Sequence, residues 1–242
     1  MKAAILTDIH GNSPALEAAL GHIDAAGDFD RIYCLGDLIG IGPDTNEVLE
    51  QLTARNDMFC ITGNHEQAVL RIIRGDGCLP GHEQAFAHHE WIAGRLDSKF
   101  VPYLSRLPLQ EEVRHEGRRI LLTHYHLGND GQYAAIDPDP DGVKLDKLYG
   151  DSGYDLVCFG HHHPVHLFRT VRRQYMNPGA LGCSDTPVAR YGVVTVRDGE
   201  VAIELKEAPY DNSLFLRSYS LLNVPDGPFI LRAFHGNQHL RL

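Results

Sequence analysis

Five short polar motifs in this sequence combine aspartate, asparagine and histidine with a neighbouring glycine or threonine. The side chains that could do chemistry are, in chain order, Asp8, His10, Asp37, Asn64, His65, His124, His161 and His163. Carboxylate, imidazole and neutral amide groups suit borderline divalent metals such as manganese, iron and zinc. The set is too large for one catalytic ion that keeps an open position, and it suits two ions that share a bridging carboxylate.

A short apolar run precedes each motif and must position it. These runs cover residues 3–6, 32–35, 58–61, 120–122 and 156–159. Apolar runs of this length, bounded by turn residues, are typical of strands buried on both faces. Ligands of open α/β sheets bind beyond the carboxyl ends of the strands. We therefore expect the five motifs to converge on one crevice.

Helical patterns alternate with these runs, which indicates an α/β protein. Ser13, followed by Pro14, predicts one helix start, and Asp44 with Glu47 three residues on predicts a capping box at another. Further helices are expected over residues 66–73 and 83–96.

Strand patterns cluster again late in the chain. Asp198-Gly199 between residues 191–196 and 201–205 predicts a hairpin, and Glu116-Gly117 predicts another. Strands that alternate with helices early and cluster late favour two packed sheets over one.

Composition limits the function classes. The 242 residues are 43% hydrophobic and 22% charged, with a net charge of -10, which is typical of one globular domain over residues 1–242 with a peripheral part from about residue 206. The acidic balance argues against broad binding to nucleic acid. No apolar run approaches the roughly 18 residues of a membrane span. The first apolar run is too short for a secretion signal, so we expect a cytoplasmic protein.

The five cysteines are scattered and never form a C-x-x-C pair. We therefore expect neither a disulfide framework nor a thiolate in the metal site. Cys34, Cys60 and Cys158 lie within apolar runs and are expected to be buried core thiols, whereas Cys183 could lie nearer the site.

Together the motifs resemble the pattern D-x-H, G-D, G-N-H-[DE], H and G-H-x-H of the calcineurin-like metallophosphoesterase superfamily. They stand here as Asp8-Ile9-His10, Gly36-Asp37, Gly63-Asn64-His65-Glu66, His124 and Gly160-His161-His162-His163. The resemblance extends over about residues 3–180, and Asn177-Pro178-Gly179 is similar to the small bacterial and archaeal phosphodiesterase branch. It implies a four-layer α/β/β/α sandwich with two mixed sheets.

The resemblance also implies a role for each motif residue. One metal would be held by Asp8, His10 and His163, and the other by Asn64, His124 and His161. Asp37 would bridge the two metals. His65 would contact the phosphoryl group, as would Asn64, and would protonate or stabilise the leaving oxygen.

Other histidines leave alternatives open. His126 could exchange roles with His124 or contact the substrate, and it could equally be a loop residue. His162, between two ligands, should point away from the metals. We expect six further histidines to be solvated: His88, His89, His115, His166, His235 and His239.

The implied activity is that of a dinuclear metal-dependent phosphoesterase. Two dications would outweigh the charges of Asp8 and Asp37 and so attract an anionic phosphate. A hydroxide bridging the metals would attack phosphorus in line. Small phosphodiesters or nucleotides are the expected substrates, dinucleoside polyphosphates among them. Manganese is the first choice of metal, with iron, zinc and nickel as alternatives.

Two other functions stay open. A protein Ser/Thr phosphatase would use the same centre. Some proteins with this fold, such as the retromer scaffold subunit, are interaction platforms that have lost parts of the catalytic set, but this chain has His65 as well as the ligands. The natural substrate, the choice between mono- and diesters, and the oligomeric state are left open.

Overall fold

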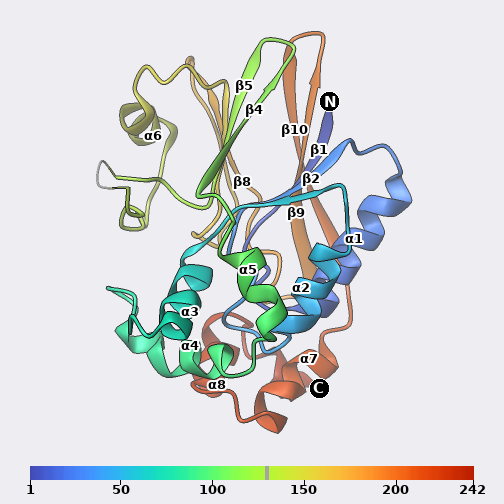
Figure 1. Ribbon diagram of the computed structural model, residues 1–242. Coiled ribbons are helices and arrows are strands. Elements are labelled where there is room, and N and C mark those ends of the chain that lie inside the picture. Colours follow the sequence, from blue (N-terminus) through green and yellow to red (C-terminus); the bar gives the residue numbers. More distant parts are fainter. Residues whose placement is uncertain (129–130) are drawn as a thin grey trace.

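The computed structural model describes residues 1–128 and 131–242, in which ten strands form two mixed five-stranded sheets that face one another (Figure 1). One sheet has the order β10-β9-β1-β2-β3 and the other β4-β5-β6-β8-β7. The strands are β1 (Lys2–Leu6), β2 (Arg31–Cys34), β3 (Met58–Cys60), β4 (Gln110–His115), β5 (Arg118–Thr123), β6 (Leu156–Cys158), β7 (His166–Arg169), β8 (Gln174–Asn177), β9 (Val188–Arg197) and β10 (Glu200–Pro209).

Side chains along the central strands alternate between the two faces of the sheet, and this explains why the apolar runs of the sequence are apolar at every position. In β1, Ala3 and Ile5 belong to the core between the sheets, whereas Ala4 and Leu6 pack into the core under the outer helices. Successive strand side chains point to opposite faces, so a strand covered on both sides needs apolar residues at every position.

Helices supply the two outer layers. Residues from α1 and α2 share a core with the first sheet, and Leu145 of α6 packs with Leu121 and Val157 on the second. The helices are α1 (Ser13–Ala26), α2 (Thr45–Thr53), α3 (Asn64–Arg74), α4 (Phe86–Ala93), α5 (Val101–Leu104), α6 (Gly142–Tyr149), α7 (Ser213–Leu221) and α8 (Gly227–Ala233), with 3-10 turns η1 (Glu83–Ala85), η2 (Ser98–Phe100) and η3 (Gln238–Arg241). None of these helices has the length and apolar character needed to cross a bilayer.

The predicted α/β class, two mixed sheets and both hairpins are confirmed, because Asp198-Gly199 joins β9 to β10 and Glu116-Gly117 joins β4 to β5. Some helix boundaries were wrong. Residues 83–96 form a 3-10 turn and a shorter helix that ends before Gly94. The first helix is capped by the side chain of Asn12, one residue before Ser13.

The second predicted cap also differs. Asp44 is the N-cap of α2, but its side chain makes no capping hydrogen bond. The capping box predicted from Asp44 and Glu47 is therefore not formed.

The C-terminal helices α7 and α8 lie below the sheets in Figure 1, near the loops that follow several strands. Phe215 of α7 and Ile230 of α8 share a buried cluster with Ile41 and Cys183. These helices therefore pack against the end of the sandwich where the polar motifs lie.

Backbone hydrogen bonds tie the loops after β1 and β8 together. Leu181 donates to the Thr7 carbonyl and Gly182 to the Asp8 carbonyl, each at 3.0 Å. A Cβ atom at Gly182 would collide with the carbonyl oxygen of Ile9, so only glycine permits this approach.

We predict that Gly182→Ala lowers the free energy of unfolding by about 1–3 kcal/mol, because the added methyl group must push the two loops apart. Chemical denaturation measures the change. The matched control is Gly21→Ala on the exposed face of α1, where a Cβ meets no atom within 4 Å. That substitution should stabilise the protein by about 0.5–1 kcal/mol. Unchanged stability of Gly182→Ala would contradict the tight loop contact.

Candidate metal centre

Four of the motif residues have a positive φ angle, which residues other than glycine rarely adopt. The φ angles of Asp8, His10, Asp37 and His161 are 53°, 51°, 50° and 65°. Such positions cost of order 1–3 kcal/mol each and cluster at functional sites. Hydrogen bonds between the loops offset the strain: Asp8 donates to the Gly36 carbonyl at 3.1 Å, and His10 to the Asp37 carbonyl at 2.9 Å.

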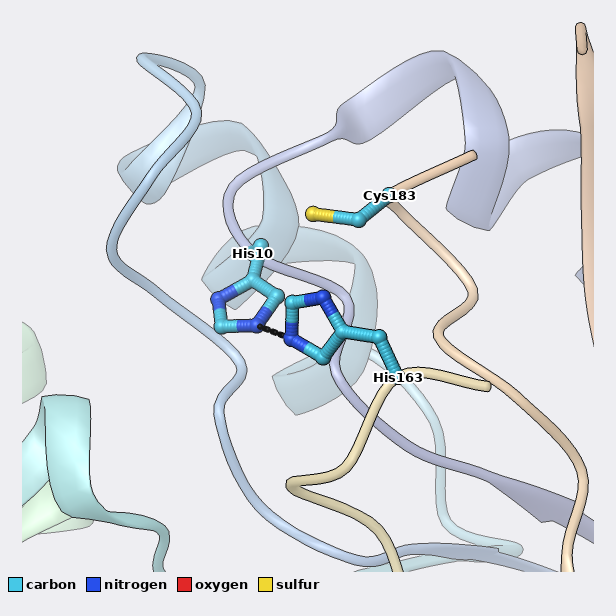
Figure 2. Close-up of side chains that lie close together, drawn as sticks. All are labelled: His10, His163 and Cys183. Carbon is cyan, nitrogen blue, oxygen red and sulfur yellow. Dashed lines mark hydrogen bonds between the residues drawn. The ribbon is translucent and has the colours of Figure 1, made fainter. Parts of the chain in front are cut away.

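A first group of converging side chains contains Asp8, His10 and His163. The Nε2 atoms of the two histidines lie 3.0 Å apart, and they lie 3.6 and 3.8 Å from Asp8 Oδ1. Figure 2 shows the two rings turned toward one another. Burial lowers the pKa of His10 well below its usual range, so its imidazole is neutral and one ring nitrogen has a free lone pair. The arrangement suits a shared cation.

Cys183 lies beside this group, as the sequence allowed (Figure 2). Its Sγ atom and one ring nitrogen each of His10 and His163 all lie within 4.8 Å of one another. The sulfur is therefore a further candidate ligand atom, and the absence of a thiolate from the metal site stays a prediction. Cys183 follows β8 by several residues, and only the loop contact with β1 brings it to the motifs. Burial raises the pKa of the thiol well above its usual range.

A second group contains Asn64, His124 and His161. His124 Nε2 lies 3.0 Å from Asn64 Oδ1 and 3.2 Å from Asp37 Oδ2, and ligand atoms of Asp37, His124 and His161 lie within 4.8 Å of one another. His124 Nδ1 donates to the Leu35 carbonyl at 2.7 Å, which turns Nε2 toward the group. Metal-bound histidines are commonly oriented in this way.

Asp37 lies between the two groups. Its Oδ2 atom is 3.2 Å from His124 Nε2 and 3.9 Å from His10 Nε2, and its Oδ1 atom accepts the His65 backbone N–H at 3.0 Å. Burial opposes ionisation, yet the neighbouring His124 holds the pKa of Asp37 well below its usual range. Burial likewise opposes a charged His124, but Asp37 raises its pKa to about 9.

The donor set fits two divalent cations. Each group offers imidazole nitrogens together with carboxylate or amide oxygens, and Asp37 is in reach of both groups. Burial lowers the pKa of His161 to about 3, which leaves its ring neutral and able to bind a metal.

Glu66 belongs to the third motif, and the resemblance assigns it no role. Its fully buried carboxylate accepts backbone N–H groups of Asp37, Ile39 and Gly63 at 2.9, 3.1 and 2.7 Å. Burial raises the pKa of Glu66 to about 7. The side chain thus joins the loop after β2 to the start of α3 and fixes both flanks of Asp37. Glu66 is the third residue of α3, whereas the predicted helix begins at Glu66 itself. A glutamate at the start of a predicted helix was the signal that could have indicated this contact.

The contact of His89 with His65 is a second feature that the sequence did not indicate. The His89 Nε2 atom is hydrogen-bonded to His65 Nδ1 at 2.9 Å, and both rings are largely withdrawn from solvent. The expectation that His88, His89 and His235 are solvated is wrong, because each is at most 4% exposed. His88 and His89 belong to α4, and His235 follows α8 and is hydrogen-bonded to the Tyr219 hydroxyl of α7.

Two histidines lie outside both groups. His126 Nδ1 is hydrogen-bonded to the Tyr149 hydroxyl at 2.8 Å, and its ring packs on Phe159. A substrate contact by His126 stays a prediction. His162 Nδ1 lies 3.0 Å from His166 Nε2, and that His162 holds no metal stays a prediction.

We predict that Glu66→Gln lowers the free energy of unfolding by about 1–3 kcal/mol, because the glutamine NH₂ would face backbone N–H donors and leave one unpaired. Misplacement of Asp37 should also reduce the bound metal. Denaturation and elemental analysis measure the two effects. Glu90→Gln on the exposed side of α4 is the control and should change neither; a Glu66→Gln protein with wild-type metal content would argue against this positioning role.

Similar proteins share this architecture. A hypothetical protein from Pyrococcus horikoshii superposes with a TM-score of 0.78 at 21% identity, over 97% of this chain and 98% of that one, which shows a common fold. An uncharacterized protein of Methanocaldococcus jannaschii is 25% identical over 226 residues, covering 86% of this chain and 87% of its own length.

A symmetrical bis(5'-nucleosyl)-tetraphosphatase from Paracidovorax citrulli is 30% identical over 122 residues. The match covers 48% of this chain and 41% of the tetraphosphatase, so it spans less than half of either protein. The model of the calcineurin-like phosphoesterase superfamily domain matches residues 1–199. The chain therefore belongs to the calcineurin-like phosphoesterase superfamily and is a phosphoester hydrolase.

Proposed function

We propose that this protein is a dinuclear metal-dependent phosphoesterase that hydrolyses small, nucleotide-like phosphoesters by in-line displacement at phosphorus. The observation that carries the proposal is the position of Asp37, whose carboxylate is within 4 Å of a histidine in each ligand group. Two ions that share one carboxylate are typical of enzymes that cleave phosphoesters.

Asp8, His10 and His163 would hold one ion, and Asn64, His124 and His161 the other. Bound there, the two cations would supply Lewis acidity at the phosphoryl group and lower the pKa of a water molecule. The Cys183 sulfur beside the first group makes zinc or iron a stronger competitor of manganese than the motifs alone indicate, because thiolates favour softer ions.

His65 would bind the phosphoryl group and stabilise or protonate the leaving oxygen. Its backbone N–H is held by Asp37, and its ring contacts His10 edge-on with centroids 5.0 Å apart. The hydrogen bond from His89 would fix which nitrogen of His65 carries a proton, and so which one faces the substrate. An interaction platform has no need for such an arrangement, which favours the enzyme over a scaffold.

The partial similarity to symmetrical bis(5'-nucleosyl)-tetraphosphatases supports nucleotides, dinucleoside polyphosphates among them, as substrates. We also propose that residues 1–242 act as one domain, since α7 and α8 share a core with Ile41 and Cys183. A cytoplasmic location and the identity of the metals stay predictions.

A panel of phosphoesters, assayed with manganese, iron, zinc and nickel in turn, tests the proposal. The panel should contain monoesters, diesters and polyphosphates, each with and without a nucleoside. Metal-dependent hydrolysis that is lost with a chelator and restored by the ion is expected. Failure of the wild-type protein, loaded with two ions, to cleave any member would contradict the proposal and favour a scaffold.

We predict that His65→Ala lowers kcat by about a hundredfold or more, since a positioned proton donor contributes roughly 10²–10⁴-fold. The metal content, measured by elemental analysis, should not change, because His65 is not a proposed ligand. His22→Ala, on the exposed face of α1, is the control and should retain wild-type kcat. Retention of full activity by His65→Ala would exclude its catalytic role.

His89 is predicted to act as a positioning residue. His89→Leu should lower kcat about tenfold with little change in KM, because the His65 ring loses the partner that orients it. His89→Gln, whose amide can reach the same nitrogen, should recover most of the activity. The shape of the pH profile of kcat should change in His89→Leu if His89 positions His65. A general loss of structure would lower kcat without changing that shape.

A further inference from the structure

A cavity of about 400 Å³ opens beside His65, between α4 and the C-terminal helix α8. His65 forms part of its wall, so the cavity borders the candidate metal centre. Pockets of about 300–1,000 Å³ are typical of small-molecule sites. The part of its wall formed by α8 lies beyond residues 1–199, the stretch that matches the family model.

Two aromatic side chains line the far wall. Phe229 and Phe234 are in edge-to-face contact, with ring centroids 6.3 Å apart and planes at 86°. Phe234 also lies against His163, with centroids 5.5 Å apart, and so joins this wall to the first ligand group. Phe229 is 52% exposed, and the Arg232 guanidinium lies over its ring at 5.8 Å from the centroid.

A buried polar group also faces the cavity. His88 is 4% exposed and lines the wall. The Pro225 backbone carbonyl lies near its ring, but neither ring nitrogen makes a well-aligned hydrogen bond within the described part of the chain. A buried unpaired imidazole nitrogen is costly unless a ligand or water satisfies it. The Gln84 amide and His82 lie on the same wall and add further donors and acceptors.

We propose that this cavity binds the base of a nucleotide whose phosphate lies at the metal centre; the inference rests on the function proposed above. A base has a flat aromatic face that can stack on Phe229 or Phe234, and a polar edge that can pair with His88 and Gln84. An aliphatic chain would cover the phenylalanines but would leave the imidazole unpaired. The cavity therefore matches a heteroaromatic ring better than a lipid.

Calorimetric binding to the manganese-loaded protein tests this inference. Two probes are compared, the non-hydrolysable phosphonate analogues of adenosine 5'-monophosphate and of ribose 5-phosphate, which differ only in the base. We expect the adenosine analogue to bind about tenfold more tightly. Phe229→Ala should remove most of that difference without weakening the ribose analogue, and His88→Leu should reduce it.

Leu221→Ala is the matched control, because Leu221 is an exposed residue of α7 that does not line the cavity. It should leave both affinities unchanged. Equal binding of the two analogues to the wild type, or an unchanged preference in Phe229→Ala, would overturn the inference. If the protein hydrolyses phosphoesters but shows no preference for a base, only the base site is contradicted. If it binds the base but hydrolyses no phosphoester, only the proposed function is contradicted.

Discussion

The burial of the Asp37 carboxylate is the constraint on which this site depends. Asp37 is 1% exposed, and the equally buried carboxylates of Asp8 and Glu66 lie close by. Buried negative charges are costly unless they are paired or coordinate a metal. The structure meets this requirement in two ways: Glu66 is surrounded by three backbone N–H donors, and Asp37 is surrounded by histidines.

The need to pair these buried carboxylates explains the arrangement of the surrounding elements. The left-handed backbone at Asp8, His10 and Asp37 turns the chain sharply at the ends of β1 and β2, which aims their side chains at one point. The turn is possible because neighbouring loops exchange backbone hydrogen bonds, which pair polar groups that the turn would otherwise bury without a partner. The regular sheet below the site thus stabilises the strained backbone of these residues.

The sequence allowed the strands and the ligand groups to be predicted because both have local signals. An apolar run followed by Gly and Asp marks a strand end wherever it occurs, and side chains at neighbouring strand ends must converge. Contacts between distant loops have no such signal. The approach of Cys183 to His10, and of His89 to His65, depends on how helices and loops pack. Glu66 was an intermediate case, since its helix position was visible but its partners after β2 were not.

The loop contact between residues 7–8 and 181–182 has a consequence for biosynthesis. Asp8 and His10 leave the ribosome early, but His163 and the segment that buttresses them emerge more than 150 residues later. During translation the nascent chain carries an incomplete set of the proposed ligands until His163 has been made. A metal site built from these residues can therefore form only after β6 of the second sheet has been synthesised.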